Sequence, residues 1–383
     1  MSETHDIFLR VHTVVPSDKK KQKRHYDGES PWPDRILAYD CETLTDPTLK
    51  LTFGAYRICK LVDDRYFCEE EGLFYADDLP AWQNEVLAQH VKAEEDVYAD
   101  IEVKSFTPKL KLRLRPRSEF VKNVFFKAIL DKTIIVGFNL PFDLARIAED
   151  WGEADDGGHS LILRHSRNPK TGQIEKDTYY PRIVYKALNS KTALIRSTQV
   201  RKKPKDDKNK DDADKRKVIF WPHGRFLDVR TLLWALRNKS YSLRKACDNK
   251  DGPFKGQNLP QKEDHTPTGN VTPAEIEYCR RDVKCTVAVL NAAKSEYDLH
   301  PIAKRPDQLY SPASVAKGYM DELKITHPSK KFKRRNHAFG IAMQAYYGGR
   351  AESAFVNVKC QSCWWISCPN TRPSTNCSVI GSF

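Results

Sequence analysis

The apolar positions of the chain follow two different periods, and together they predict alternating strands and helices. Short runs that are apolar, or that alternate with polar residues, predict strands at 35–43, 51–61, 65–76 and 132–139. The last run, KTIIVGFN, is apolar almost without interruption, which is typical of a strand buried on both faces. The VDD segment between the second and third runs predicts an antiparallel hairpin.

Three other stretches favour helices, at 79–97, 118–130 and 272–297. Ser118 is a candidate cap for the second helix, whose apolar residues form one stripe. The third helix has the clearest start, because Thr272 and Glu275 form a capping box around Pro273 at the first helical position.

The order of the predicted elements indicates the fold class. Several strands are expected between 160 and 200, with a hairpin turn in ALNSKTAL, and VIFWPHGRFLDVRTLLWAL predicts a strand followed by a helix. The whole order predicts an α/β fold with a mixed central sheet flanked by helices. Two segments fall outside it: residues 1–30 are expected to be a basic flexible arm, and 201–217 a charged disordered loop.

Composition and charge narrow the class of protein. The chain has 383 residues, 40% of them hydrophobic, which allows one large domain or two modest ones. No apolar run approaches the roughly 20 residues that cross a bilayer, and the start lacks a signal peptide, so we expect no membrane partner and a cytoplasmic (intracellular) protein. The net charge of +13, clustered at 19–24, 109–117 and 330–335, favours a polyanionic partner such as nucleic acid, although a basic surface alone is the simpler explanation.

Candidate chemistry begins at the ends of two predicted strands. Asp40 and Glu42 end the first strand in RILAYDCE, and residues two apart on a strand share a face. A lone D-x-E motif is weak. Asn139 and Asp143 follow the buried strand in GFNLPFD, where a helix cap followed by an acid near the helix N-terminus is the alternative explanation.

The long helix adds Tyr278 and Asp282 in YCRRD, four residues apart and therefore on one face. Alone they could be a surface pair. Together the motifs D-x-E, N-x-x-F-D and Y-x-x-x-D occur in the order and structural context of the DEDD 3′–5′ exonucleases, tyrosine subclass, and the chain resembles that family over about residues 31–300. The resemblance implies a ribonuclease H-like (DnaQ-type) exonuclease fold for 31–300.

The resemblance also implies roles for these residues. Packed carboxylates repel one another unless cations neutralise them, and hard divalent cations prefer oxygen ligands. By resemblance, two Mg²⁺ or Mn²⁺ ions are held by Asp40, Glu42, Asp143 and Asp282. Tyr278 is then expected to position the attacking water, with Asn139 and Phe142 near the terminal nucleotide. Asp228 is expected either to support the metal ligands or to cap a helix.

The chain continues beyond the nuclease-like part. Residues 301–355 are expected to be helical, with Ser311 and Pro312 starting a helix. YYGGRAE at 346–352 resembles the stretch that joins the exonuclease to the palm in family B-like DNA polymerases, although glycines that end a helix are the alternative. These residues are therefore expected to begin a polymerase region.

The last segment, 356–383, changes character abruptly and lacks the acidic palm motif that the resemblance leads us to expect. Its four cysteines lack the second close pair of ordinary zinc ribbons, so no zinc is expected. A frameshift is the sharper hypothesis, because any codons for CWWI, read from each third base, encode Leu-Val-Asp. The gene is then expected to encode a longer polymerase, and the chain to leave frame near Val358.

These features predict the proofreading exonuclease of a family B-like DNA polymerase, truncated before the palm. It would remove 3′-terminal nucleotides as monophosphates from single-stranded 3′ ends or primer-template DNA, without polymerase activity. Two alternatives remain open: a stand-alone DNA or RNA 3′ exonuclease, and a non-catalytic nucleic-acid-binding remnant of a polymerase.

Overall fold

The computed structural model describes residues 32–94, 97–98, 109–110, 112–154, 158–168, 171–177, 180–189, 192–198, 200–201, 219–220, 224–262 and 264–325. Residues 30–319 group into one compact unit. The predictions for the arm at 1–30, the tail at 356–383 and almost all of the charged loop at 201–217 lie outside the described residues. So does YYGGRAE.

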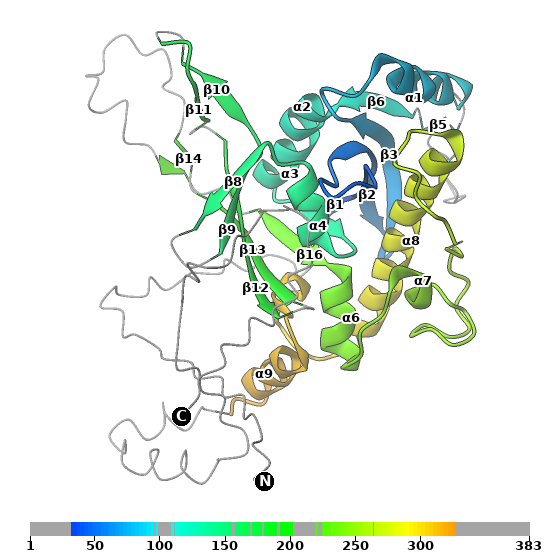
Figure 1. Ribbon diagram of the computed structural model, residues 1–383. Helices are drawn as coiled ribbons and strands as arrows, with labels where there is room; N and C mark the ends of the chain where they lie inside the picture. Colours follow the sequence, from blue (N-terminus) through cyan, green and yellow to red (C-terminus); the bar gives the residue numbers. More distant parts are fainter. Residues whose placement is uncertain are drawn as a thin grey trace, which may run out of the picture. The chain divides into compact units, whose positions relative to one another are not determined.

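A six-stranded mixed sheet is the centre of this unit (Figure 1). Its strand order is β16-β7-β1-β2-β3-β6. The strands are β1 (Arg35–Thr43), β2 (Leu51–Val62), β3 (Arg65–Tyr75), β6 (Arg113–Pro116), β7 (Ile134–Gly137) and β16 (Arg225–Asp228). β1, β2 and β3 are antiparallel neighbours, whereas β7 is parallel to β1 and to β16. The expected α/β class with a mixed sheet flanked by helices is confirmed, and it is consistent with a ribonuclease H-like fold.

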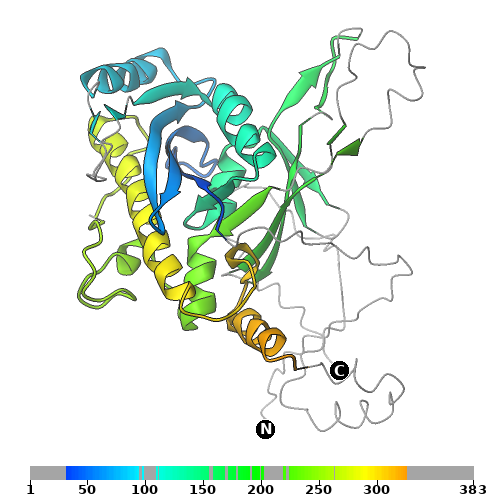
Figure 2. The same cartoon turned by 180° about the vertical axis from the view of Figure 1, so that it is seen from behind.

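Helices cover both faces of the sheet. Alternate residues of β1 are therefore buried on opposite sides, in two separate cores. Ile36 and Ala38 pack into a core with α1, α6, α7 and α8, while Leu37 and Tyr39 pack into a second core with α2, α3 and α4. Figure 2 shows the sheet between the yellow helix α8 and the cyan-green helices. The helices are α1 (Ala81–Ala93), α2 (Arg117–Phe120), the π-helix η1 (Val121–Phe125), α3 (Phe126–Leu130), α4 (Leu140–Arg146), α6 (Val229–Arg237), α7 (Leu243–Ala246), α8 (Pro273–Tyr297) and α9 (Pro312–Glu322), with a 3-10 turn η2 (Pro306–Gln308).

A second, four-stranded sheet packs beside α4, since Leu161 and Ile183 share the second core with Leu140 and Leu144. Its order is β13-β12-β9-β8, and all its pairs are antiparallel. The strands are β8 (Asp150–Glu153), β9 (His159–Ile162), β12 (Ile183–Asn189) and β13 (Thr192–Ser197). Shorter pairs are β4 (Val97–Tyr98) with β5 (Lys109–Leu110), β10 (His165–Arg167) with β11 (Ile174–Lys176), and β14 (Val200–Arg201) with β15 (Ile219–Phe220).

Helix starts follow the sequence signals at some positions and not at others. The Thr272 side chain accepts a hydrogen bond from the Glu275 amide at 3.2 Å, as the capping box predicts. The Ser118 cap is wrong, because the residue at that cap is Pro116 and the Ser118 amide instead donates to Asp77 Oδ1 at 3.0 Å. None of the helices among the described residues combines the length and apolarity needed to cross a membrane.

Candidate functional site

The site forms where β1 extends past its parallel neighbour. β7 pairs with β1 only from Ile36 to Ala38, so the last part of β1 has an open side. Asp40 and Glu42 continue the face of Ala38, which is the face that α8 covers. The two carboxylates and the Cys279 thiol of α8 offer ligand atoms within 4.8 Å of one another.

Asp143 reaches the same place from α4. The turn before this helix puts Asn139 in the left-handed region, at φ 74° and ψ 43°, a conformation that asparagine tolerates better than most residues. Asp143 is 2% exposed, and its Oδ1 accepts a hydrogen bond from the Cys41 amide at 3.2 Å. The α4 carboxylate is thereby held against the backbone between Asp40 and Glu42.

The long helix α8 supplies the fourth acid. Asp282 is 5% exposed, and its Oδ2 accepts a hydrogen bond from the Lys262 ammonium. Its other oxygen, Oδ1, is buried without a hydrogen-bond partner among the described residues. Such an atom is costly to bury unless something positive occupies the space beside it.

The pKa directions show that these acids act on one another. Burial, and then the charge of Asp282, raise the pKa of Asp40 to about 7, while Lys262 opposes the rise. Burial and the charge of Asp40 raise the pKa of Glu42 and of Asp143 well above the usual range. Burial also raises the pKa of Asp282, against the attraction of Lys262. The Lys262 ammonium and the Arg281 guanidinium, which also opposes the rise in the pKa of Asp282, carry less positive charge than four ionised carboxylates carry negative charge.

The donor set fits hard divalent cations. It offers carboxylate oxygens, and one of them, Asp282 Oδ1, has no hydrogen-bond partner among the described residues. Extra positive charge at this place would lower the energy of the ionised acids. Burial raises the pKa of the Cys279 thiol well above its ordinary value, so this sulfur stays protonated and is a poor ligand beside the carboxylates. Mg²⁺ or Mn²⁺ held by oxygens is therefore the occupant that the residues suit.

Tyr278 lies one turn before Asp282 at the edge of this cluster. Its ring packs against the His265 ring, with centroids 4.6 Å apart, and the Lys262 Nζ lies 4.6 Å from its centroid. Burial raises the pKa of the Tyr278 phenol, and a hydrogen bond with Lys262 opposes that rise. The hydroxyl is consequently protonated near neutral pH and can orient a water molecule by hydrogen bonding.

Three further predicted residues lie at the neighbouring strand ends. Asp228 caps α6, because its carboxylate accepts from the amides of Arg230 and Asn139, each at 3.0 Å. Asn139 is held in its turn by this contact and makes no side-chain cap of α4. Phe142 is half-buried beneath the Arg146 guanidinium, 4.8 Å from the ring centroid. Asp228 thus makes the capping contacts that were one of its two expected roles.

Lys262 is the site neighbour that the sequence did not indicate. It lies in the stretch 249–271, which shows only loop character, and no periodicity or motif connects it to YCRRD. The structure brings it to Tyr278 and Asp282 through long-range packing that a one-dimensional pattern does not encode.

A second acidic group lies on the far side of α8, where ligand atoms of His90, Glu94 and Glu277 come within 4.8 Å of one another. The Arg280 guanidinium already contacts all of them, at 3.2 Å, 3.5 Å and 2.7 Å from the same Nη1. A guanidinium of the chain thus contacts every member of this group, and the carboxylates of Glu94 and Glu277 share its single positive charge.

The fold defines the chain as a mixed α/β protein. Comparison with solved structures finds a distant similarity to one DNA polymerase. No protein-family model and no curated protein matches the sequence. Among solved structures, the chain is similar to Phi29 DNA polymerase complexed with primer-template DNA and incoming nucleotide substrates, with 12% identity and a TM-score of 0.28. The match covers 79% of this chain and 36% of that polymerase chain. Because the likeness is so distant, the chemistry proposed below depends on the residues of the site.

Proposed function

We propose that the chain is a metal-dependent 3′–5′ exonuclease, the proofreading part of a family B-like DNA polymerase. The observation that carries the proposal is the meeting of Asp40, Glu42, Asp143 and Asp282, contributed by β1, α4 and α8, next to the Lys262 ammonium. The substrate is the 3′ end of single-stranded DNA or of primer-template DNA, and the product is a nucleoside monophosphate. In this proposal residues 31–300 are the nuclease and 301–355 begin the polymerase region.

The four carboxylates would hold two divalent ions. Such a pair of ions, when bound, stabilises the attacking and leaving oxygens of an in-line phosphoryl displacement. The residues of the chain have their own tasks. The protonated Tyr278 hydroxyl orients the water, and Asn139 and Phe142 lie at the start of α4, where the terminal nucleotide would rest.

The direct test follows a 5′-labelled single strand as it is shortened from its 3′ end, in Mg²⁺ or Mn²⁺. Asp40→Ala and Asp143→Ala should each lower the rate at least about 100-fold, since each removes a proposed metal ligand. Asp131→Ala is the matched control, because Asp131 is an exposed aspartate outside the cluster. Equal rates for Asp40→Ala and Asp131→Ala would show that the cluster is not catalytic.

The same assay separates the alternatives. Tight binding of the strand without cleavage in either metal favours a non-catalytic remnant of a polymerase. Cleavage of both RNA and DNA 3′ ends favours a stand-alone exonuclease. Sequencing the gene around and beyond the codon for Val358 tests the frameshift, because a second open frame that encodes the palm motif is expected there.

A further inference from the structure

The loop that precedes α8 places two side chains against the Tyr278 ring. The His265 ring packs on it with centroids 4.6 Å apart at an interplanar angle of 33°. The Lys262 Nζ lies 4.6 Å from the centroid of the same tyrosine ring. One short segment of the loop therefore contacts the tyrosine with both an aromatic ring and a cation.

The His265 ring lies along the first turns of α8. Glu275 and Tyr278 are three residues apart on this helix, so they lie on one side of it. The His265 Nε2 lies 3.6 Å from Glu275 Oε1, while the ring packs on Tyr278. The imidazole is thus adjacent to two successive positions on the same side of the helix.

The loop is attached to α8 on both sides of His265 along the chain. Before it, the Lys262 ammonium donates a hydrogen bond to Asp282. After it, the amide and the hydroxyl of Thr268 donate to Oε1 of the buried Glu275, at 2.6 Å and 2.7 Å. These two attachments restrict how far the His265 ring can move away from Tyr278.

The position leaves one nitrogen of His265 without a hydrogen bond. Its Nε2 is buried and has no hydrogen-bond partner among the described residues, because the distance to Glu275 is too long for one. A buried polar atom without a partner costs free energy. The ring contact with Tyr278 is a favourable contact that offsets this cost.

The Tyr278 hydroxyl depends on the orientation of its ring. Tyr278 is half-buried at the edge of the acidic cluster. Burial raises the pKa of its phenol, and the charges of Asp282 and Glu42 add to the rise, so the hydroxyl lies near these carboxylates. A misplacement of about 1 Å in a reacting arrangement can cost about 100-fold in rate. A ring packed against the tyrosine would prevent such a misplacement.

We propose that His265 is a positioning residue, whose ring fixes the Tyr278 ring so that the hydroxyl stays directed at the carboxylate cluster. His265 acts through stacking and contacts neither the metal ligands nor the reacting phosphate. The inference rests on the proposed function in one respect, since it takes the Tyr278 hydroxyl to orient the attacking water.

A double-mutant cycle in the cleavage assay tests the inference on the full chain in Mg²⁺. His265→Ala should lower kcat about tenfold and leave KM for the strand within about twofold, because the ring positions the hydroxyl and does not hold the strand. His265→Phe keeps a ring without nitrogens and should stay within about threefold of the parent chain. In chains that carry Tyr278→Phe, His265→Ala should change kcat less than about twofold, because the hydroxyl that it positions is gone.

A second measurement does not need activity. In the full chain labelled with fluorotyrosine, in EDTA, the fluorine NMR resonance of Tyr278 is the one that Tyr278→Phe removes. His265→Ala should move this resonance towards that of free fluorotyrosine, because the neighbouring ring is lost. His159→Ala is the matched control in both experiments, since His159 of β9 stacks on Tyr185 of β12, with centroids 4.9 Å apart at 25°. It should change neither kcat nor the Tyr278 resonance.

The outcomes separate the positioning role from the nuclease itself. Equal kcat values for His265→Ala and His159→Ala overturn the inference, even if Asp40→Ala abolishes cleavage. Equal losses from His265→Ala with and without the Tyr278 hydroxyl also overturn it, as does a His265→Phe chain as slow as His265→Ala. If the parent chain cleaves nothing in either metal, the proposed function is wrong, whereas the ring contact is supported by a resonance that moves in His265→Ala and refuted by one that does not.

Discussion

Asp40 illustrates how strongly single residues of the site depend on one another. Its carboxyl group is half-buried beside Asp282, and its pKa of about 7 means that the folded chain retains a proton there that the unfolded chain has lost. A raised carboxyl pKa favours the fold below the unfolded value and loses that contribution as pH rises through the folded value. The relevant window here runs from the ordinary value of 3.8 to about 7.

We therefore expect the chain in EDTA to lose thermal stability as pH rises from 5 to 8. Asp40→Asn removes this titration, so at pH 8 it should unfold about 2 °C or more above the parent chain, equivalent to about 1 kcal/mol. Mn²⁺ should stabilise the parent more than the variant, because a bound cation replaces the proton. Thermal melts at each pH provide the measurement, with Asp131→Asn as control, and a parent chain whose stability rises steadily to pH 8 contradicts the expectation.

Lys262 is the residue whose removal should change the pH profile most directly. Lys262→Met removes the ammonium that hydrogen-bonds Asp282, so the pKa values of Asp282 and Asp40 should rise further. We expect hydrolysis to fall about 10–100-fold and its rise with pH to move to higher pH. Lys255→Met, at an exposed lysine of the same loop, should leave both unchanged. A lower rate with an unmoved profile would point to a purely structural role for Lys262.

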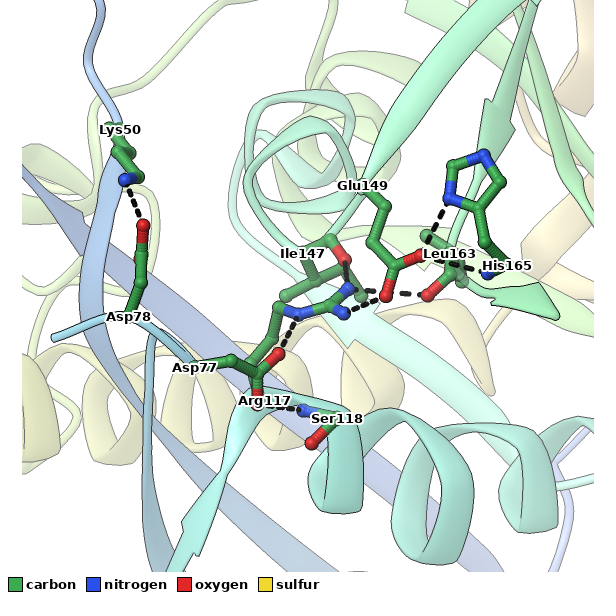
Figure 3. Close-up of polar contacts among 9 residues, drawn as sticks. All are labelled: Lys50, Asp77, Asp78, Arg117, Ser118, Ile147, Glu149, Leu163 and His165. Carbon is green, nitrogen blue, oxygen red and sulfur yellow. Dashed lines mark hydrogen bonds and ion pairs between the residues drawn. The ribbon is translucent and has the colours of Figure 1, made fainter. Parts of the chain in front are cut away.

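At the scale of the elements, the buried side chain of Arg117 connects the four-stranded sheet to the rest of the compact unit. Arg117, at the start of α2, donates from Nε to Asp77 Oδ2 at 3.0 Å and from Nη1 to the carbonyl oxygens of Ile147 and Leu163 at 2.7 Å and 3.2 Å (Figure 3). It also pairs with Glu149, which accepts from the His165 amide at 2.8 Å. One guanidinium thus ties together segments that follow β3, α4 and β9.

Arg117→Met should lower the free energy of unfolding by about 3 kcal/mol, because it leaves buried carbonyl oxygens and two partly exposed carboxylates without their donor. Lysine has one compact head group, so Arg117→Lys should recover only part of the loss. Arg113→Met is the control: this side chain is 54% exposed in its pair with Glu70, and its loss should cost less than about 1 kcal/mol. Chemical denaturation measures all three, and similar midpoints for Arg117→Met and Arg113→Met would refute the expectation.

The elements also show what the sequence can and cannot predict. β1, the β2–β3 hairpin and α8 follow from apolar period and a capping box, because those signals are local. The stretch 118–130 is helical as expected, yet it contains a π-helical turn, and the helix begins at Arg117, directly after Pro116, rather than at a serine cap. The Lys262–Asp282 pair was not foreseen, since it depends on how a loop packs across 20 residues of chain.

At the scale of the whole compact unit, the segment 301–309, which follows α8, packs back against the six-stranded sheet. Arg225 of β16 donates from Nε to Asp307 Oδ1 at 3.1 Å, and the two side chains are 4% and 6% exposed. Ile302 and Leu309 are buried in the first core. The sheet therefore depends on residues that come after the last proposed metal ligand.

A fragment of residues 30–319 should accordingly unfold at nearly the same temperature as the full chain. A fragment of 30–300 should be less stable by about 3–5 kcal/mol, since it leaves the buried Arg225 without its carboxylate. Asp307→Asn in the full chain assigns the loss to this pair, because it keeps the side-chain volume and removes the charge. Equal melting temperatures for the two fragments would rule out a structural role for 301–319.

The Cys279 thiol lies 3.8 Å from the Asp40 carbonyl oxygen, a contact across 239 residues of chain. As the polypeptide leaves the ribosome, β1 is therefore complete long before α8 exists to close the acidic cluster. A chain whose synthesis stops before that helix contains Asp40 and Glu42 but lacks Tyr278 and Asp282. Under the proposed function, a chain would therefore gain its nuclease site only when synthesis is nearly complete.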